Sequence, residues 1–242
     1  MDRPIDLTLE ICAHRYVSNM TFKSIEIFRW HTVKTHMTYW INVHSGDALI
    51  GRSRSVACTE FLEKGLSDYM IFIDDDIMFH PDAIEKIYQE LKSGKDLVGG
   101  CYPVKRAEQL ASWGFEKIDG TVQKCEYVAT GFMGISLRLL QKMVDKLELP
   151  LLHPDIPYRC YPFFESGRSK TPKGDNIYIS EDWDFCNKAK EIGVTPYLHT
   201  GVWVAHEGPT IFTVEEAIEN MKKSGGCTEK PNRVERRRKT KC

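Results

Sequence analysis

The stretch "YMIFIDDDIMFHP", residues 69–81, joins five apolar or aromatic residues directly to three consecutive aspartates. A segment that is apolar on both faces predicts a central parallel strand covered by helices on both sides. Pro81 then begins a predicted helix, because the apolar residues after it recur at helical spacing. We therefore expect Asp74, Asp75 and Asp76 at the carboxyl end of a buried strand.

Strands and helices alternate around this segment, which predicts an α/β fold with a mostly parallel sheet. Further strands are predicted at 7–13, 37–43, 96–104, 125–136 and 196–206, and helices at 20–32, 54–64, 140–147, 181–192 and 213–223. The proline-rich stretch 150–176 breaks the periodicity and predicts a long loop, a candidate lid. Ligands of such sheets bind outside the carboxyl ends of the strands.

Composition places the chain among globular proteins of ordinary charge. Its 242 residues are 42% apolar and 28% charged, and we expect one domain over 1–229. No apolar run is long enough for a membrane span and the first residues lack a signal-peptide pattern, so we expect a cytoplasmic protein. The eight cysteines form no CxxC pair, which favours reduced thiols.

The charge is concentrated at the C-terminus. Residues 230–242 hold seven Lys or Arg and one Glu, a balance of +6 in a chain of net charge -1. We expect this basic tail to be disordered. Three roles are compatible with its charge: binding to phosphate backbones, binding to an anionic membrane surface, or a terminus that is simply solvated.

Three adjacent carboxylates repel one another, and a hard divalent cation with oxygen ligands relieves that repulsion. In extended geometry alternate side chains share a face, so Asp74 and Asp76 would converge and Asp75 would point away. The alternative is a set of aspartates that cap the helix beginning at Pro81.

The segment "FIDDDIMFHPDAI" resembles the DxD motif of nucleotide-sugar glycosyltransferases with the GT-A fold, of the family-2-like or viral and phage type. The resemblance implies a three-layer, Rossmann-like sandwich around a central, mostly parallel mixed sheet. It also implies that Asp74 and Asp76 hold Mn²⁺ or Mg²⁺ at the donor diphosphate, with Asp75 near the donor ribose or sugar.

Other segments match that family in their order along the chain. "GDALIGRSRSVA" resembles the segment where an arginine-bearing helix meets the nucleotide, and "ATGFMGISLRLLQKM" resembles the strand and bend beneath the sugar. The alternatives are a solvated helix terminus and a simple bulge. The residues that the resemblance assigns to nucleotide-sugar binding, besides Asp74 and Asp75, are Ala13, His14, Arg15, Arg52, Arg54, Trp113, Gly131 and Phe132.

"SEDWDFCNKAKEIG" resembles the acidic motif that supplies the catalytic base of inverting members. Asp182 is the first candidate for a base within hydrogen-bond reach of an acceptor hydroxyl, and Glu181 is the second. The alternative is that these acids only stabilise a helix N-terminus. His206 in "VWVAHEG" is the third candidate metal ligand, with Glu207 in reserve, although a lone histidine is also compatible with a structural role.

The resulting hypothesis is metal-dependent transfer of a sugar from a nucleoside-diphosphate donor, expected to be UDP-linked, to an acceptor hydroxyl. The acceptor could be a glycan, a lipid-linked sugar or a nucleic acid such as hydroxymethylated DNA. Two alternatives stay open, a metal-dependent nucleotidyltransferase and a non-catalytic sugar- or nucleotide-binding module. The sequence contains no Walker A motif and no GxGxxG after a strand, which disfavours P-loop and dinucleotide-binding proteins.

Overall fold

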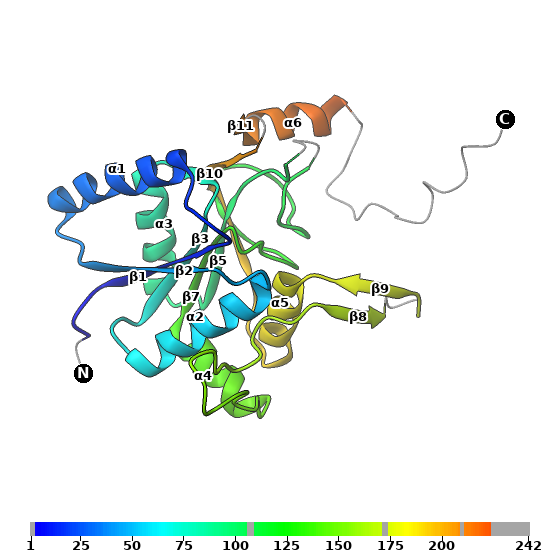
Figure 1. Cartoon of the computed structure of the whole chain (residues 1–242). Coiled ribbons are helices and arrows are strands. Elements are labelled where there is room, and N and C mark those ends of the chain that lie inside the picture. Colours follow the sequence, from blue (N-terminus) through cyan, green and yellow to red (C-terminus); the bar gives the residue numbers. More distant parts are fainter. Residues whose placement is uncertain (1–2, 106–108, 171–173, 209–210, 224–242) are drawn as a thin grey trace.

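The computed structural model describes residues 3–105, 109–170, 174–208 and 211–223 (Figure 1). Nine strands of this described part join one sheet, whose main path runs β11-β10-β5-β7-β3-β1-β2 while β4 and β6 pair with β10. They are β1 (Leu7–Ala13), β2 (Tyr39–Ser45), β3 (Tyr69–Asp74), β4 (Ile77–Phe79), β5 (Leu97–Cys101), β6 (Val122–Lys124), β7 (Phe132–Ser136), β10 (Tyr197–Glu207) and β11 (Ile211–Phe212).

Strand β3 lies near the centre of this sheet, as its apolar sequence predicts. It pairs in parallel with β1 and antiparallel with β7, and its residues 70–73 are buried. Strands β2, β1, β3, β5 and β10 share one direction, and β7 runs the opposite way between β3 and β5. The predicted α/β class, with a mostly parallel mixed sheet, is confirmed.

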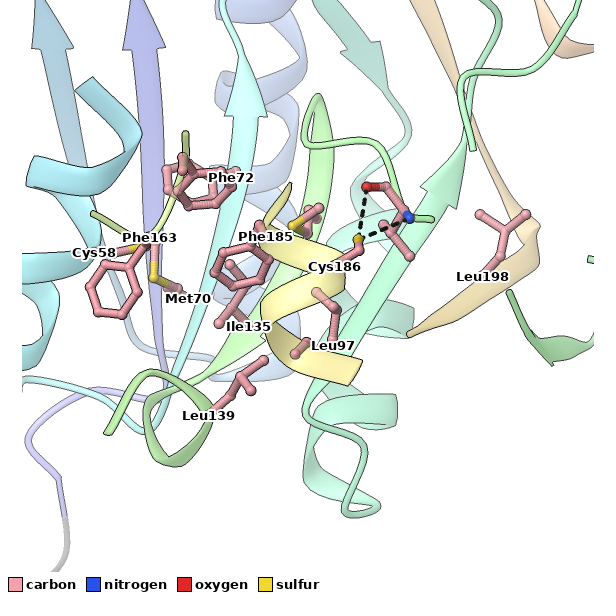
Figure 2. Packing of buried hydrophobic residues seen from close by; sticks show 14 of the residues in the cluster. Cys58, Met70, Phe72, Leu97, Ile135, Leu139, Phe163, Phe185, Cys186 and Leu198 are labelled. Atoms are coloured by element: carbon pink, nitrogen blue, oxygen red, sulfur yellow. Dashed lines mark hydrogen bonds between the residues drawn. The ribbon is translucent and has the colours of Figure 1, made fainter. Parts of the chain in front are cut away.

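Helices cover both faces of the sheet. They are α1 (Asn19–Thr35), α2 (Ile50–Lys64), α3 (Pro81–Lys92), α4 (Leu137–Lys146), α5 (Glu181–Glu191) and α6 (Val214–Lys223). Met70 and Phe72 of β3 pack in a cluster with α2, α4 and α5, part of which Figure 2 shows, whereas Ile71 and Ile73 pack with α1 and α3. Alternate side chains of one strand thus enter two separate cores, which gives the three layers.

The helix boundaries follow local signals in the sequence. Pro81 occupies the first turn of α3, and Gly65 ends α2 in the left-handed conformation at φ 55°. Thr213 and Glu216 form a reciprocal capping box at the start of α6, in which each side chain accepts from the other residue's backbone N–H.

Two predicted segments differ from the structure. The strand expected over 125–136 is regular only in β7, because residues 125–131 follow an irregular path along α5. The stretch 150–176, predicted as a loop, contains β8 (Gly167–Lys170), which pairs antiparallel with β9 (Asn176–Ile179). This hairpin extends away from the sheet in Figure 1.

Three further expectations concern the chain as a whole. No helix in the described part of the chain combines the length and the apolar character that a bilayer crossing requires. Six cysteines of that part are buried free thiols, as the scattered spacing predicts. The basic tail predicted at 230–242 lies outside the described residues.

Candidate functional site

The three strand-end aspartates lie where β3 leaves the sheet, and each has different partners. Asp74 is the last residue of β3, whereas Asp75 and Asp76 form a turn that leads into β4. Side chains alternate between two faces only in an extended chain, and Asp75 and Asp76 lie in a turn. The prediction that extended geometry places Asp74 and Asp76 on one face is therefore wrong. In the described part of the chain, no three His, Cys, Asp or Glu side chains gather closely enough to hold a metal ion.

Arg54 connects the end of β3 with the N-terminus of α5. Its Nη2 lies 2.5 Å from Oδ1 of Asp74, and its Nη1 lies 2.5 Å from Oε1 of Glu181, 127 residues further along the chain. The arginine side chain is 6% exposed. Burial alone would lower the pKa of Arg54, but the charges of the two carboxylates outweigh burial and raise it. The motif after β3 and the acids of α5 therefore belong to one site.

Asp182 lies at the same end of α5, beside Glu181. Its carboxylate accepts hydrogen bonds from the Ser180 hydroxyl and from the backbone N–H of Trp183, at 2.8 Å in the second case. Burial raises the pKa of Asp182, the bond from Ser180 lowers it, and the charge of Glu181 raises it further, with a raised pKa as the result. A partly buried carboxylate with a raised pKa is well suited to accept a proton near neutral pH.

Tyr102 is a site residue that sequence reasoning did not identify. Its hydroxyl accepts a hydrogen bond of 2.8 Å from the backbone N–H of Gly131, whose carbonyl accepts from the backbone N–H of Asp74 at 3.0 Å. Burial raises the pKa of Tyr102 well above its ordinary value, and the nearby charges of Asp74 and Asp182 raise it further. In the sequence, this tyrosine at the end of an apolar strand looks like an ordinary core residue.

Gly131 is required by this close packing. A Cβ at position 131 would lie 2.6 Å from the Tyr102 hydroxyl oxygen and 3.2 Å from Oδ2 of Asp74. The glycine predicted to permit close backbone approach thus lies directly against the first aspartate of the motif.

Asp76 and His206 form the second half of the site. Nε2 of His206 lies 3.2 Å from Oδ1 of Asp76, and Nδ1 of His206 donates to the carbonyl oxygen of Pro103 at 3.1 Å. Burial raises the pKa of Asp76, but hydrogen bonds from His206 and Lys105 outweigh it, so the pKa is lowered. The Lys105 ammonium contacts the other carboxylate oxygen of Asp76.

These contacts fit the divalent cation that the resemblance implies. A histidine that ligates a metal usually donates its other ring N–H to a carbonyl or carboxylate, as His206 does to Pro103. Its Nε2 is thereby directed at Asp76, which supplies an oxygen donor. Positive charge is already drawn to this carboxylate, since Lys105 contacts it. Asp76 and His206 are thus two residues that could hold such an ion, and no third His, Cys, Asp or Glu of the described residues gathers with them.

The remaining predicted residues are only partly brought together. His14 donates its backbone N–H to Oδ2 of Asp75 at 3.2 Å, which places Ala13, His14 and Arg15 beside the motif at the end of β1. Burial and the charge of Asp76 raise the pKa of Asp75.

Two predicted contacts are placed elsewhere by the structure. Arg52 does not join Arg54 but forms a bidentate pair with Asp47 at the surface, at 2.7 and 2.9 Å. The Phe132 side chain is fully buried, with its ring centre 5.5 Å from that of Phe79 in the core. The Phe132 ring therefore packs in the core between the sheet and α3, and its side chain is not open to a nucleotide sugar.

Trp113 lies further along the same edge, in an isolated antiparallel bridge with Tyr127. Tyr127 in turn stacks on Trp183 of α5, with ring centres 4.3 Å apart and planes 10° apart. Trp113 therefore reaches the candidate base region through Tyr127.

The carboxyl edge of this mixed sheet combines a buried arginine, strand-end aspartates and a helix that begins with acids. This arrangement is the one expected of a GT-A glycosyltransferase. Residues 51–165 of the chain match the model of glycosyl transferase family 2. The match confirms the predicted resemblance at the level of the family, whose general activity is glycosyl transfer. It includes Arg54, the aspartate motif and Gly131, and it ends before Glu181 and His206.

Among solved structures, the chain is similar to the crystal structure of A197 from STIV. The two share 17% sequence identity at a TM-score of 0.55, over 86% of this chain and 91% of the other. A similarity at this identity concerns the fold alone. None of the curated proteins matches the chain.

Proposed function

We propose that this protein transfers a sugar from a nucleoside-diphosphate donor, UDP-linked, to an acceptor hydroxyl in a metal-dependent reaction. The observation that carries the proposal is the bridge from Asp74 through Arg54 to Glu181. It unites the donor-side motif of the family with an acidic helix terminus that offers a general base.

The donor side comprises Asp74, Asp76, His206 and Lys105. A divalent cation bound to Asp76 and His206 would supply Lewis-acid stabilisation of the charge that develops on the leaving diphosphate. Lys105 contributes a further positive charge on the same side, since its side chain is half exposed and reaches Asp76. Gly131 borders this side, where the absence of a side chain lets Tyr102 and Asp74 lie close to the backbone.

The acceptor side is centred on Asp182. Its carboxylate takes the proton of the acceptor hydroxyl as that oxygen attacks the anomeric carbon. Arg54 positions Glu181 and keeps its charge paired, so that Asp182 is the carboxylate of α5 left to act on substrate. This assignment describes an inverting reaction.

The test is product analysis with a panel of nucleotide sugars, with and without Mn²⁺ or Mg²⁺. We expect metal-dependent release of the nucleoside diphosphate by acceptor transfer or by slow donor hydrolysis. Release of pyrophosphate would instead indicate nucleotidyl transfer, and no turnover with any donor would indicate a non-catalytic binding module.

Variants assign the roles within the site. Asp182→Asn should abolish transfer while donor binding is preserved, and Asp184→Asn is its control on the same helical turn, where that side chain pairs with Lys188. Asp76→Asn should weaken Mn²⁺ binding, whereas Asp82→Asn, at the surface start of α3, should not. Equal activity of Asp182→Asn and the unmodified protein would exclude Asp182 as the base.

A further inference from the structure

An aromatic stack beside the candidate base has no role in the chemistry described so far. Trp183 directly follows Asp182, and its backbone N–H donates to the Asp182 carboxylate at 2.8 Å. The indole lies parallel to the Tyr127 ring, and both side chains are partly exposed. Core aromatics are normally buried on all sides, so a partly exposed stack at an active-site edge needs a separate explanation.

The order of this stack follows from the helix. Trp183 and Lys190 are seven residues apart on α5 and therefore lie on the same helix face, two turns from each other. The Lys190 ammonium lies over the Tyr127 ring, 4.0 Å from its centre, and Trp183 stacks on that ring at 4.3 Å. Tyr127 therefore contacts both side chains, and Trp183 lies in the first turn of α5 together with Glu181 and Asp182.

The stack is fixed in place from both sides. The Cys186 thiol of α5 contacts the backbone N–H and C=O of Val128, at 3.4 and 3.6 Å, as Figure 2 shows. Trp113 holds Tyr127 from the other side through two backbone hydrogen bonds of 2.9 and 3.1 Å. Residues bridged in this antiparallel manner direct their side chains to the same face, so Trp113 adds a third partly exposed ring to the group.

We infer that Trp183, supported by Tyr127, is the platform on which the acceptor binds, and that the acceptor is a saccharide. This inference rests on the proposed function. The apolar C–H face of a sugar ring packs on an indole, and a ring seated on the face of Trp183 away from Tyr127 would lie beside Asp182, the preceding residue. Among the described residues, Tyr127 is the sole aromatic partner of Trp183, so no described ring covers its other face.

The charges around the platform favour a neutral sugar over a nucleic acid. Glu181, Asp182 and Asp184 all lie in the first turn of α5. Glu181 is paired with Arg54 and Asp184 with Lys188, so Asp182 is the acid of this turn that has no ion pair among the described residues. A phosphodiester chain is held by released counterions and basic side chains, and the carboxylate of Asp182 opposes it. A saccharide carries no such charge and can donate a hydroxyl hydrogen bond to Asp182.

The direct test is isothermal titration calorimetry with saccharide probes, in the presence of Mn²⁺ and UDP. Lactose, cellobiose and maltose are the probes, and single-stranded oligothymidylate is the competing class. We expect a saccharide to bind the unmodified protein and Trp40→Leu, which alters a tryptophan on the edge strand β2, with the same affinity. Trp183→Leu should bind it about tenfold or more weakly, the scale of one aromatic contact together with its buried area.

A conservative variant separates stacking from folding. Trp183→Phe replaces the indole by a smaller aromatic ring, so this variant should retain transfer of the sugar to the acceptor. Trp183→Leu has no ring and should retain only hydrolysis of the donor. Saccharide binding that is unchanged in Trp183→Leu, binding by none of the three probes, or a response to oligothymidylate alone would overturn the inference. Loss of metal-dependent donor hydrolysis in the unmodified protein would count against the proposed function instead, because the titration does not depend on turnover.

Discussion

Replacing Arg54 by methionine removes the buried cation between Asp74 and Glu181 while it keeps most of the side-chain volume. The two carboxylates then face each other without compensation, with side chains only 27% and 15% exposed. Breaking a buried ion pair by removal of one partner costs about 3–5 kcal/mol. Because water still reaches part of Asp74, we expect a loss near the lower end, about 3 kcal/mol of unfolding free energy.

The assay is urea denaturation of the unmodified protein and of three variants. Arg52→Met is the matched control, since Arg52 lies on the same helix but pairs with Asp47 at the surface, and we expect little change there. The triple variant Arg54→Met, Asp74→Asn, Glu181→Gln should recover much of the loss, because the uncompensated charges disappear with the arginine. Equal stability of Arg54→Met and Arg52→Met would refute the description of Arg54 as the electrostatic centre of the site.

Three further predictions concern single contacts. Ser180→Ala removes a hydrogen bond that lowers the pKa of Asp182, so this pKa should rise and the acid limb of the pH–rate profile should move to higher pH. An unchanged limb would argue against Asp182 as the base. Lys105→Met frees the carboxylate of Asp76, so the affinity for Mn²⁺, measured by electron paramagnetic resonance, should increase about two- to fivefold while the affinity for UDP falls. Weaker Mn²⁺ binding would contradict the idea that Lys105 and the ion compete for Asp76. Gly131→Ala introduces a Cβ against the buried hydroxyl of Tyr102 and should lower both the melting temperature and the turnover. An unchanged melting temperature would show that Tyr102 can move to accept the Cβ without loss of stability.

The parts of the fold that the sequence predicts are those governed by neighbouring residues. The buried strand before Asp74, the proline at the start of α3 and the glycine that ends α2 depend on burial, fixed φ and a left-handed turn, all of which act locally. The antiparallel direction of β7 is different, because it depends on which strands meet in the sheet. A strand's own residues carry little information about that choice.

The site residues also fall into two groups, those that the sequence could propose and those that only the packing of distant segments reveals. Residue type and position at a strand end are enough to propose Asp74 as a candidate, whereas Asp182 and His206 are proposed because their segments resemble those of the glycosyltransferase family. The role of Arg54 as a bridge over 127 residues and the contact of Tyr102 with Gly131 arise only when distant segments pack. The burial of the Phe132 ring is also a matter of distant packing, because an aromatic side chain at a strand start is compatible with either side of the sheet until its neighbours are known.

Strand β10 changes partners part-way along its length. It follows β5 up to His199, shifts register before Trp203, and then pairs with β4, which places His206 opposite Ile77, next to the aspartate turn. The irregular residues between the two registers can absorb insertions or deletions, whereas the length from Trp203 to His206 cannot change without moving the imidazole to the other face. We therefore expect related sequences to vary in length between the two registers of β10 and to keep the spacing between Trp203 and His206.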